Sequence, residues 1–174
     1  MTDLYFFDTD CISAFLWVRD ESILAQLYSG RIILPQQVYD EIKAVPHLLN
    51  RVDTMKNAGQ LSVQNIMYGT EEYSDYCGLA ISPPAGETII GKGEAAAIAL
   101  VKKNNGVLAS NNLRDVKKYV EKYNLKHITT GDILAEALKR GIITENEGNV
   151  IWGNMLNKRR MLPTSTFSDY LKTI

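Results

Sequence analysis

Three acidic residues stand where the surrounding sequence pattern would place apolar side chains. Asp8 directly follows the apolar run LYFF, while Glu41 and Glu94 each fall on the apolar stripe of a predicted helix. The neighbours on those stripes recur at i, i+3, i+4 and i+7, the spacing of one helix face. A carboxylate facing a core is costly unless a cation or hydrogen-bond donors compensate its charge. Such carboxylates, far apart in sequence and converging in space, suggest a divalent metal.

Short apolar segments that alternate with amphipathic helices must position these acids. The alternation predicts a mostly parallel sheet of four to five strands with helices on both faces, a three-layer α/β/α fold in one domain. The expected strands are residues 4–7, 31–34, 61–63, 106–110 and 127–130. The expected helices follow residue 8 and cover about 21–29, 36–45, 48–58, 71–80, 94–104, 112–123, 132–140 and 144–157, with a loop at 81–93 and a last helical turn after 164.

In an open parallel sheet, sites form beyond the carboxyl ends of the strands. Asp8 ends the first strand, and Ser110, Asn111 and Asn112 end the strand at 106–110. Hard cations prefer oxygen ligands, and a bound cation can activate water against a phosphodiester.

Each acid also has a purely structural interpretation. Asp8 could cap the following helix, Glu94 could favour a helix dipole, Glu41 could reach solvent, and Asp115 could be an exposed helix residue. The sequence leaves these alternatives open for each residue, while the joint pattern favours a metal site.

Composition narrows the class of protein. The 174 residues suffice for one domain with a substantial core. The formal net charge of −1 indicates no overall electrostatic attraction to a polyanion. No apolar stretch approaches a membrane span, and the start lacks the features of a signal peptide. Cys11 and Cys77 do not form a metal-spaced cluster, so reduced thiols in a soluble cytoplasmic protein are expected.

Four segments carry a resemblance to a known family. FFDTDCISAFL, IILPQQVYDEI, GKGEAAAIALV and VLASNNLRD follow one another in the order and spacing of the four motifs of PIN-domain nucleases, the family that includes VapC-type toxins. The resemblance covers residues 1–140 and implies a PIN-like domain, with 141–174 as a C-terminal helical extension packed on it. Asn111 and Asn112 depart from the family pattern, which typically has aspartates there.

The resemblance implies a metal-dependent endoribonuclease that acts as the toxin of a toxin–antitoxin pair. Its partners would be RNA and a cognate antitoxin, and a homodimer is expected. The implied catalytic and metal-binding residues, with Mg²⁺ or Mn²⁺ as cofactor, are Asp8, Glu41, Glu94 and Asp115. The implied supporting residues are Thr9, Ser110, Asn111 and Asn112, and the RNA backbone would meet Arg114, Lys117 and Lys118.

Two other functions stay open. FFDTD contains the Asp-x-Asp of haloacid-dehalogenase-like phosphatases, with VLAS and TTGD as their later motifs, although Glu41 and Glu94 would then be unexplained. Alternatively, Asn111 and Asn112 could mark a catalytically impaired module that binds RNA or a partner. Further RNA contacts could come from the basic run 158–160, for which a solvated face is the alternative. Stacking on bases could come from Tyr68, Tyr73 and Tyr76, for which core packing is the alternative.

Overall fold

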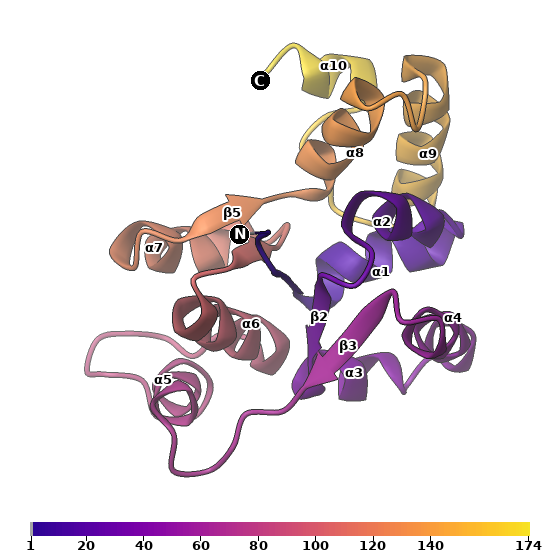
Figure 1. The fold of residues 1–174 in the computed structure, drawn as a ribbon. Coiled ribbons are helices and arrows are strands. Elements are labelled where there is room, and N and C mark those ends of the chain that lie inside the picture. Colours follow the sequence, from indigo (N-terminus) through magenta and orange to yellow (C-terminus); the bar gives the residue numbers. More distant parts are fainter. Residues whose placement is uncertain (1) are drawn as a thin grey trace.

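The computed structural model describes residues 2–174, which form a five-stranded sheet with every neighbouring pair of strands parallel. The strand order is β3-β2-β1-β4-β5, so the chain builds one half of the sheet, returns to the centre and builds the other (Figure 1). The order therefore reverses between β1 and β4, where an open sheet forms its crevice. The strands are β1 (Tyr5–Phe7), β2 (Ile32–Pro35), β3 (Leu61–Gln64), β4 (Val107–Ala109) and β5 (Lys126–Ile128).

Alternation along the strands creates two cores, one on each face of the sheet. Phe6 belongs to one core and Phe7 to the other, and both side chains are fully buried. Successive side chains of a strand point to opposite faces, so each central strand contributes to both layers. Helices α1 to α4 and α8 to α10 cover the face of Phe7, and α5 to α7 cover the face of Phe6. This arrangement confirms the predicted three-layer α/β/α fold.

The helices alternate with the strands as the periodicity predicts. They are α1 (Thr9–Val18), α2 (Glu21–Tyr28), α3 (Gln36–Ile42), α4 (Pro46–Asn57), α5 (Glu71–Ala80), α6 (Lys92–Asn104), α7 (Leu113–Lys122), α8 (Thr130–Lys139), α9 (Glu145–Asn157) and α10 (Phe167–Leu171).

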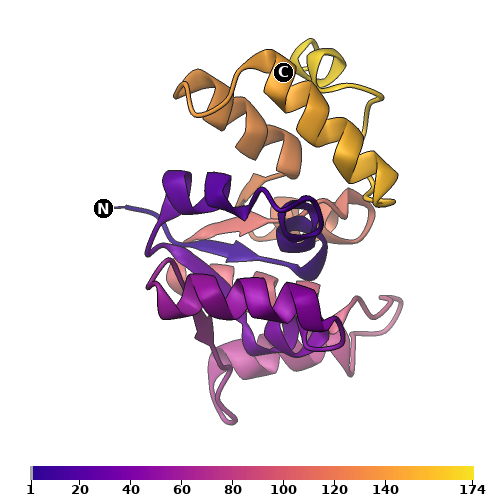
Figure 2. The ribbon, with the colours of Figure 1, turned by 90° about the vertical axis from the view of Figure 1, so that its right-hand side faces the viewer.

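The C-terminal helices pack on the same core as the N-terminal ones. Helix α9 contacts α1 and α8, and α10 contacts α8 and α9 (Figure 2). The fully buried Trp152 of α9 lies with its ring centroid 5.8 Å from that of Phe167 and 5.3 Å from that of Tyr170, both on α10. Aromatic burial thus fixes the end of the chain to the domain.

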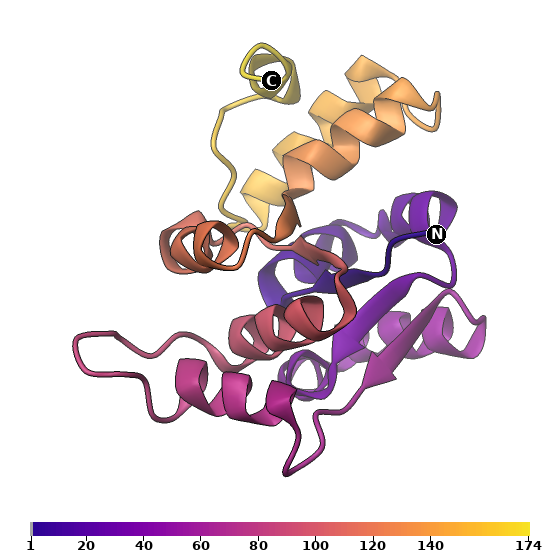
Figure 3. The same ribbon diagram turned by 60° about the vertical axis from the view of Figure 1, so that its left-hand side comes forward.

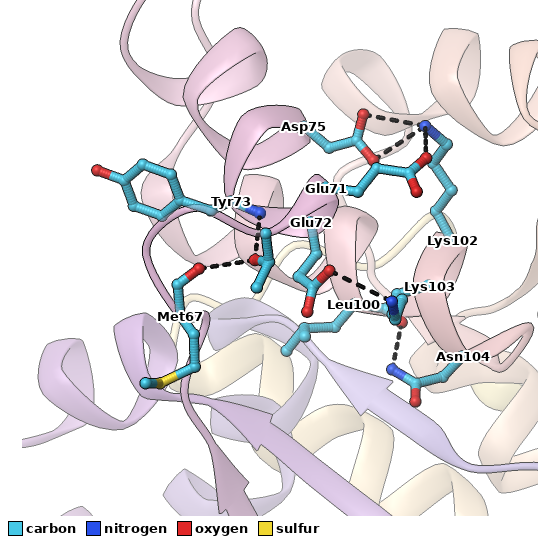
Figure 4. Close-up of polar contacts among 10 residues, drawn as sticks. Met67, Glu71, Glu72, Tyr73, Asp75, Leu100, Lys102, Lys103 and Asn104 are labelled. Atoms are coloured by element: carbon cyan, nitrogen blue, oxygen red, sulfur yellow. Dashed lines mark hydrogen bonds and ion pairs between the residues drawn. The ribbon is translucent and has the colours of Figure 1, made fainter.

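Helix α5 is fastened to α6, the helix that begins beside Glu94. The Lys102 ammonium lies 2.9 Å from a carboxylate oxygen of Asp75, and that of Lys103 lies 3.7 Å from Glu72 (Figure 4). Exposed ion pairs contribute only about 0–1 kcal/mol, so the buried side chains between the helices supply most of the attraction. The connection from α5 to α6 extends away from the body of the domain (Figure 3).

The predicted element boundaries hold within a few residues, and the end of β5 shows how a local hydrogen bond sets one of them. The strand expected at 127–130 ends at Ile128, because Thr129 is the N-cap of α8 and forms a reciprocal capping box with Asp132. Thr144 and Glu147 form a second capping box, at the start of α9, where the helix at 144–157 was expected. No helix within residues 2–174 is long and apolar enough to cross a bilayer. Both cysteines are free thiols.

Candidate active site

Asp8 lies at the crevice of the sheet and is the one fully buried acid within residues 2–174. It follows β1 and caps α1, where its Oδ1 atom accepts a 2.8 Å hydrogen bond from the backbone N–H of Cys11. The capping role proposed as a structural alternative is therefore correct, but it uses only one oxygen. The Oδ2 atom has no hydrogen-bond partner among the described residues, and the side chain is fully buried. Burial raises the pKa of Asp8 to about 7, although the neighbouring Ser110 hydroxyl and the Cys11 N–H oppose the rise.

A second acidic group is held together by Asn112, the N-cap residue of α7. Its side-chain amide donates to Glu94 Oε1 at 2.6 Å and to Asp115 Oδ2 at 2.8 Å. The other Glu94 oxygen accepts from the backbone N–H of Gly91 at 3.3 Å, a capping contact on α6. Burial raises the pKa of Glu94; the Asn112 bond opposes that rise and the charge of Asp115 adds to it. Glu94 and Asp115, distant in sequence, thus meet at one amide.

Glu41 lies in an adjoining polar cluster on the other side of the α6 N-terminus. The Thr9 hydroxyl donates to Glu41 Oε2, and the backbone N–H of Gly93 donates to Oε1 at 3.3 Å. A Cβ atom at Gly93 would fall 2.9 Å from the Thr9 hydroxyl, so glycine permits this close approach. The expectation that Glu41 faces the core is wrong. Its side chain is exposed, because α3 buries Val38 and Ile42 and turns the intervening residue outward.

Asp10 belongs to the acidic group, although sequence reasoning did not assign it there. It lies in the first turn of α1, and its charge raises the pKa of both Asp8 and Glu94. It also lines a cavity of about 390 Å³ together with Asn112. The sequence pattern that points to Asp10 is the second aspartate of FFDTD, which the phosphatase interpretation alone uses.

The two remaining residues after β4 have structural partners. The Asn111 side chain donates to the Thr130 hydroxyl at 2.7 Å and accepts from the Thr130 backbone N–H at 2.8 Å. Both ends of its amide are therefore engaged in joining β4 to α8. Ser110 is fully buried, and its hydroxyl accepts a 3.3 Å bond from the backbone N–H of Asn112.

Of the three basic residues expected to meet RNA, only Arg114 lines the cavity beside the acids. Lys117 lies 3.9 Å from a carboxylate of Glu121, and Lys118 lies 4.0 Å from Glu87. These lysines belong to a solvated helix face on which they pair with acidic side chains. Arg160, from the basic run after α9, lines the cavity opposite α7.

The tyrosines expected as stacking surfaces divide between surface and core. Tyr76 is buried, whereas Tyr68 is 87% exposed. Tyr73 meets Tyr68 edge to face, with 5.2 Å between ring centroids. These rings lie on and before α5, and none of them lines the cavity beside the acids.

A sequence-family model described as a PIN domain matches residues 4–174. The chain belongs to the PIN-domain family. PIN domains are generally nucleases, so the fold of this chain is of nuclease type and its expected chemistry is hydrolysis of a nucleic acid. Comparison with curated proteins gives no match, and comparison with solved structures gives none either.

Membership of the PIN family also bears on the phosphatase alternative. The late acidic motif of a haloacid-dehalogenase-like phosphatase would use Asp132 of TTGD. Both oxygens of that carboxylate, however, accept hydrogen bonds within the protein. Asp132 accepts from the backbone N–H of Thr129 at 2.8 Å and from the Tyr170 hydroxyl at 2.8 Å. Asp132 therefore caps α8 and anchors α10.

PIN nucleases typically use divalent metals, which require several oxygen donors within reach of one another. Within residues 2–174, no three or more His, Cys, Asp or Glu side chains form a group already spaced to hold a metal. The donors nevertheless suit a hard cation in kind, because they are carboxylates that raise one another's pKa and include the unpartnered Asp8 oxygen. These residues thus fit a divalent cation chemically, although their spacing is not yet that of a closed site.

Proposed function

We propose that this PIN domain is a metal-dependent endoribonuclease with Asp8, Asp10, Glu94 and Asp115 as its acidic centre. The observation that carries the proposal is the Asp8 carboxylate, fully buried at the reversal of strand order. Its second oxygen accepts no well-formed hydrogen bond within residues 2–174, and the neighbouring Ser110 hydroxyl only moderates its raised pKa. A buried carboxylate destabilises a fold unless hydrogen-bond donors or a bound cation compensate its charge. Function is the physical reason that best accounts for its retention.

The residues of the proposed site have distinct roles. Asp8, Asp10, Glu94 and Asp115 would hold Mg²⁺ or Mn²⁺, which supplies charge stabilisation and an activated water when bound. Asn112 orients Glu94 and Asp115 through its amide. Glu41 and Thr9 form the neighbouring hydrogen-bonded wall, and Ser110 supports the backbone at Asn112. Glu41 contacts the acidic centre through the α6 N-terminus, so its part is to position that helix.

The experiment is cleavage of a labelled single-stranded RNA by the purified protein with Mn²⁺, with excess EDTA, and after Glu94→Gln. Cleavage that requires metal and is lost in the variant is expected. Glu121→Gln, an exposed acid on α7, is the matched control and should cleave normally. A fully active Glu94→Gln protein would contradict the assignment of the acidic centre.

A catalytically impaired RNA- or partner-binding PIN domain is the second candidate, favoured by the amide at Asn112 in place of a charged ligand. Calorimetric titration with Mn²⁺ separates the two. Binding that disappears in Glu94→Gln supports the nuclease, whereas no binding at millimolar metal favours the impaired module.

We extend the proposal to the partners that the resemblance implies: a role as the toxin of a toxin–antitoxin pair, a cognate antitoxin and a homodimer. The free cysteines are compatible with the cytoplasmic location proposed with them. We also retain the division into a PIN-like domain at 1–140 and a helical extension at 141–174. Light scattering of the purified protein tests the dimer, and co-purification with the product of a neighbouring reading frame tests the antitoxin.

A further inference from the structure

Two adjoining cavities open beside the acidic centre, and the second has no role in the proposed chemistry. The first, of about 390 Å³, lies between the start of α7 and the segment after α9. The second, of about 550 Å³, continues from it toward α8 and α10. Asn111, Leu113 and Met161 line both cavities, so they form one groove that begins at the acids. Volumes of this size are typical of sites for small ligands or parts of larger ones.

The end of the groove near the acids carries two guanidinium groups. Arg114 comes from α7 and Arg160 from the segment after α9, so residues far apart in sequence face the same cavity. Arg160 is half-buried, its guanidinium lies 5.8 Å from the Trp17 ring centroid, and its Nε donates to the Lys158 carbonyl oxygen at 3.0 Å. Among the described residues it has no carboxylate partner within ion-pair distance. Arg160 is thus held in place with its charge uncompensated.

Charge decides which ligand suits this end of the groove. Two guanidinium groups and the Asp10 carboxylate line this cavity, and Asp115 beside it pairs with Arg114, so Arg160 supplies the positive charge that no carboxylate of residues 2–174 matches within ion-pair distance. Arg114 also lies 3.3 Å from Asp115 and is 90% exposed at its side chain, so it can turn toward an anion in the cavity. Guanidinium groups match phosphate oxygens in geometry and in charge.

The far end of the groove is apolar. Leu113 and Met161, which the two cavities share, are 48% and 89% exposed, and Leu162 and Pro163 continue this apolar wall into the second cavity, with Thr129, Thr164 and Thr173 beyond it. Exposed apolar side chains that surround a recess next to bound phosphate suit the flat face of a nucleobase. A base in this recess and a phosphate at the arginines would belong to one nucleotide.

We propose that this groove is a nucleotide subsite, in which Arg114 and Arg160 bind the backbone phosphate next to the scissile one and the apolar recess holds its base. The proposal rests on the proposed nuclease function, because it places the substrate strand across the acidic centre. It assigns substrate binding to the C-terminal segment, which the four motifs do not include.

The test is binding of a fluorescent single-stranded RNA of about eight nucleotides, measured by anisotropy in EDTA over a range of salt. Arg160→Gln and Arg114→Gln are each expected to weaken binding about tenfold at low salt. Each should also lower the slope of log K against log salt by about 0.7, the value for one lost phosphate contact on a single strand. Arg159→Gln is the matched control, because Arg159 belongs to the same basic run but lines neither cavity.

A second arm tests the base. Leu113→Ser should weaken binding of the RNA but leave binding of an abasic strand of the same length unchanged, and Val150→Ser, an exposed apolar residue elsewhere, should alter neither. Equal binding by the Arg160, Arg114 and Arg159 variants would overturn the subsite, as would the absence of RNA binding by the parent protein. Because binding is measured without metal, selective loss in the arginine variants supports the subsite even if no RNA is cleaved. Conversely, metal-dependent cleavage with unchanged binding in those variants would refute the subsite and leave the nuclease intact.

Discussion

Replacing Asp8 by asparagine should stabilise the metal-free protein, although it removes the residue on which the proposed activity most depends. Burial raises the pKa of Asp8 from its ordinary value of 3.8 to about 7. In the unfolded chain the carboxyl ionises near pH 4, so between about pH 4 and pH 7 the folded state binds the additional proton. Stability contributed by this group therefore falls as pH rises through that window and stays low above it.

The magnitude follows from the same two values. A difference of about three pKa units corresponds to about 4 kcal/mol at neutral pH and above. Asparagine keeps the oxygen that accepts from Cys11, but its amide N–H₂ enters a buried place beside the Ser110 hydroxyl, which already accepts from the Asn112 N–H, at a cost of about 1–3 kcal/mol. The net expectation is a gain of about 2 kcal/mol for Asp8→Asn at about pH 8, or a rise in Tm of about 4–8 °C.

Thermal and urea unfolding in EDTA between about pH 4 and pH 8 measure this effect. The difference in unfolding free energy between Asp8→Asn and the parent should be small at low pH and grow to a plateau. Asp40→Asn is the control of opposite sign, because Lys43 lowers the pKa of the exposed Asp40 and its loss should slightly destabilise the protein above its titration. Added Mn²⁺ should raise the Tm of the parent but not of Asp8→Asn. A variant that is no more stable than the parent at pH 8, with a difference independent of pH, would refute the reasoning.

Three further predictions concern the acids and the packing of the C-terminal helices. Asp10→Asn should weaken Mn²⁺ binding about tenfold in calorimetry, because one negative charge leaves the centre, and unchanged affinity would exclude Asp10 from it. Asn112→Asp should lower the Tm in EDTA, because its donor is replaced by a third carboxylate, and should increase the rise in Tm that Mn²⁺ produces; an identical metal response would argue against a site there. Gly131→Ala should lower the free energy of unfolding in urea by about 1–3 kcal/mol, because the new Cβ falls 2.3 Å from the Tyr170 ring of α10. Gly153→Ala in α9 is the control: its Cβ would have nothing within 4 Å, so it should be neutral or stabilise the protein by about 0.5–1 kcal/mol. Equal effects of the two glycine substitutions would show that α10 does not pack as described.

The sequence predicted the layers of the fold because local periodicity determines them. The run at Phe6 and Phe7 identifies a strand buried on both faces, and its two rings do enter different cores. The end of β5 was not predictable in the same way. Thr129 has a high strand propensity, but its hydroxyl caps α8 and the Asp132 carboxylate accepts a hydrogen bond from the Thr129 backbone N–H. These local hydrogen bonds end the strand before Thr129.

The site was predicted less completely, because burial depends on how helices turn when they pack. Glu41 shares a heptad-like spacing with Val38 and Ile42, yet α3 is only seven residues long and rotates that carboxylate to the surface. Spacing along a helix identifies neighbours but does not say which of them forms the edge of the buried stripe. Asn111 was expected to support the site through its amide, and only the packing of α8 shows that Thr130 occupies both ends of it.

Asp10 and Asn112 are best understood together. In the family pattern a carboxylate would stand at 112, where it would face Glu94 and Asp115 at hydrogen-bond distance and repel both. The amide instead donates to both, so the centre forms without metal at a lower electrostatic cost. Asp10, on the opposite wall of the same cavity, restores the negative charge from a position exposed to water, where an ionised carboxylate is far less costly than in the core. In the proposed centre, the acid absent from the fourth motif would thus be compensated by one in the first. A protein that carries both Asp10→Asn and Asn112→Asp would have the same number of acids as the parent, so its Mn²⁺ affinity would show whether the number or the position of the charges matters.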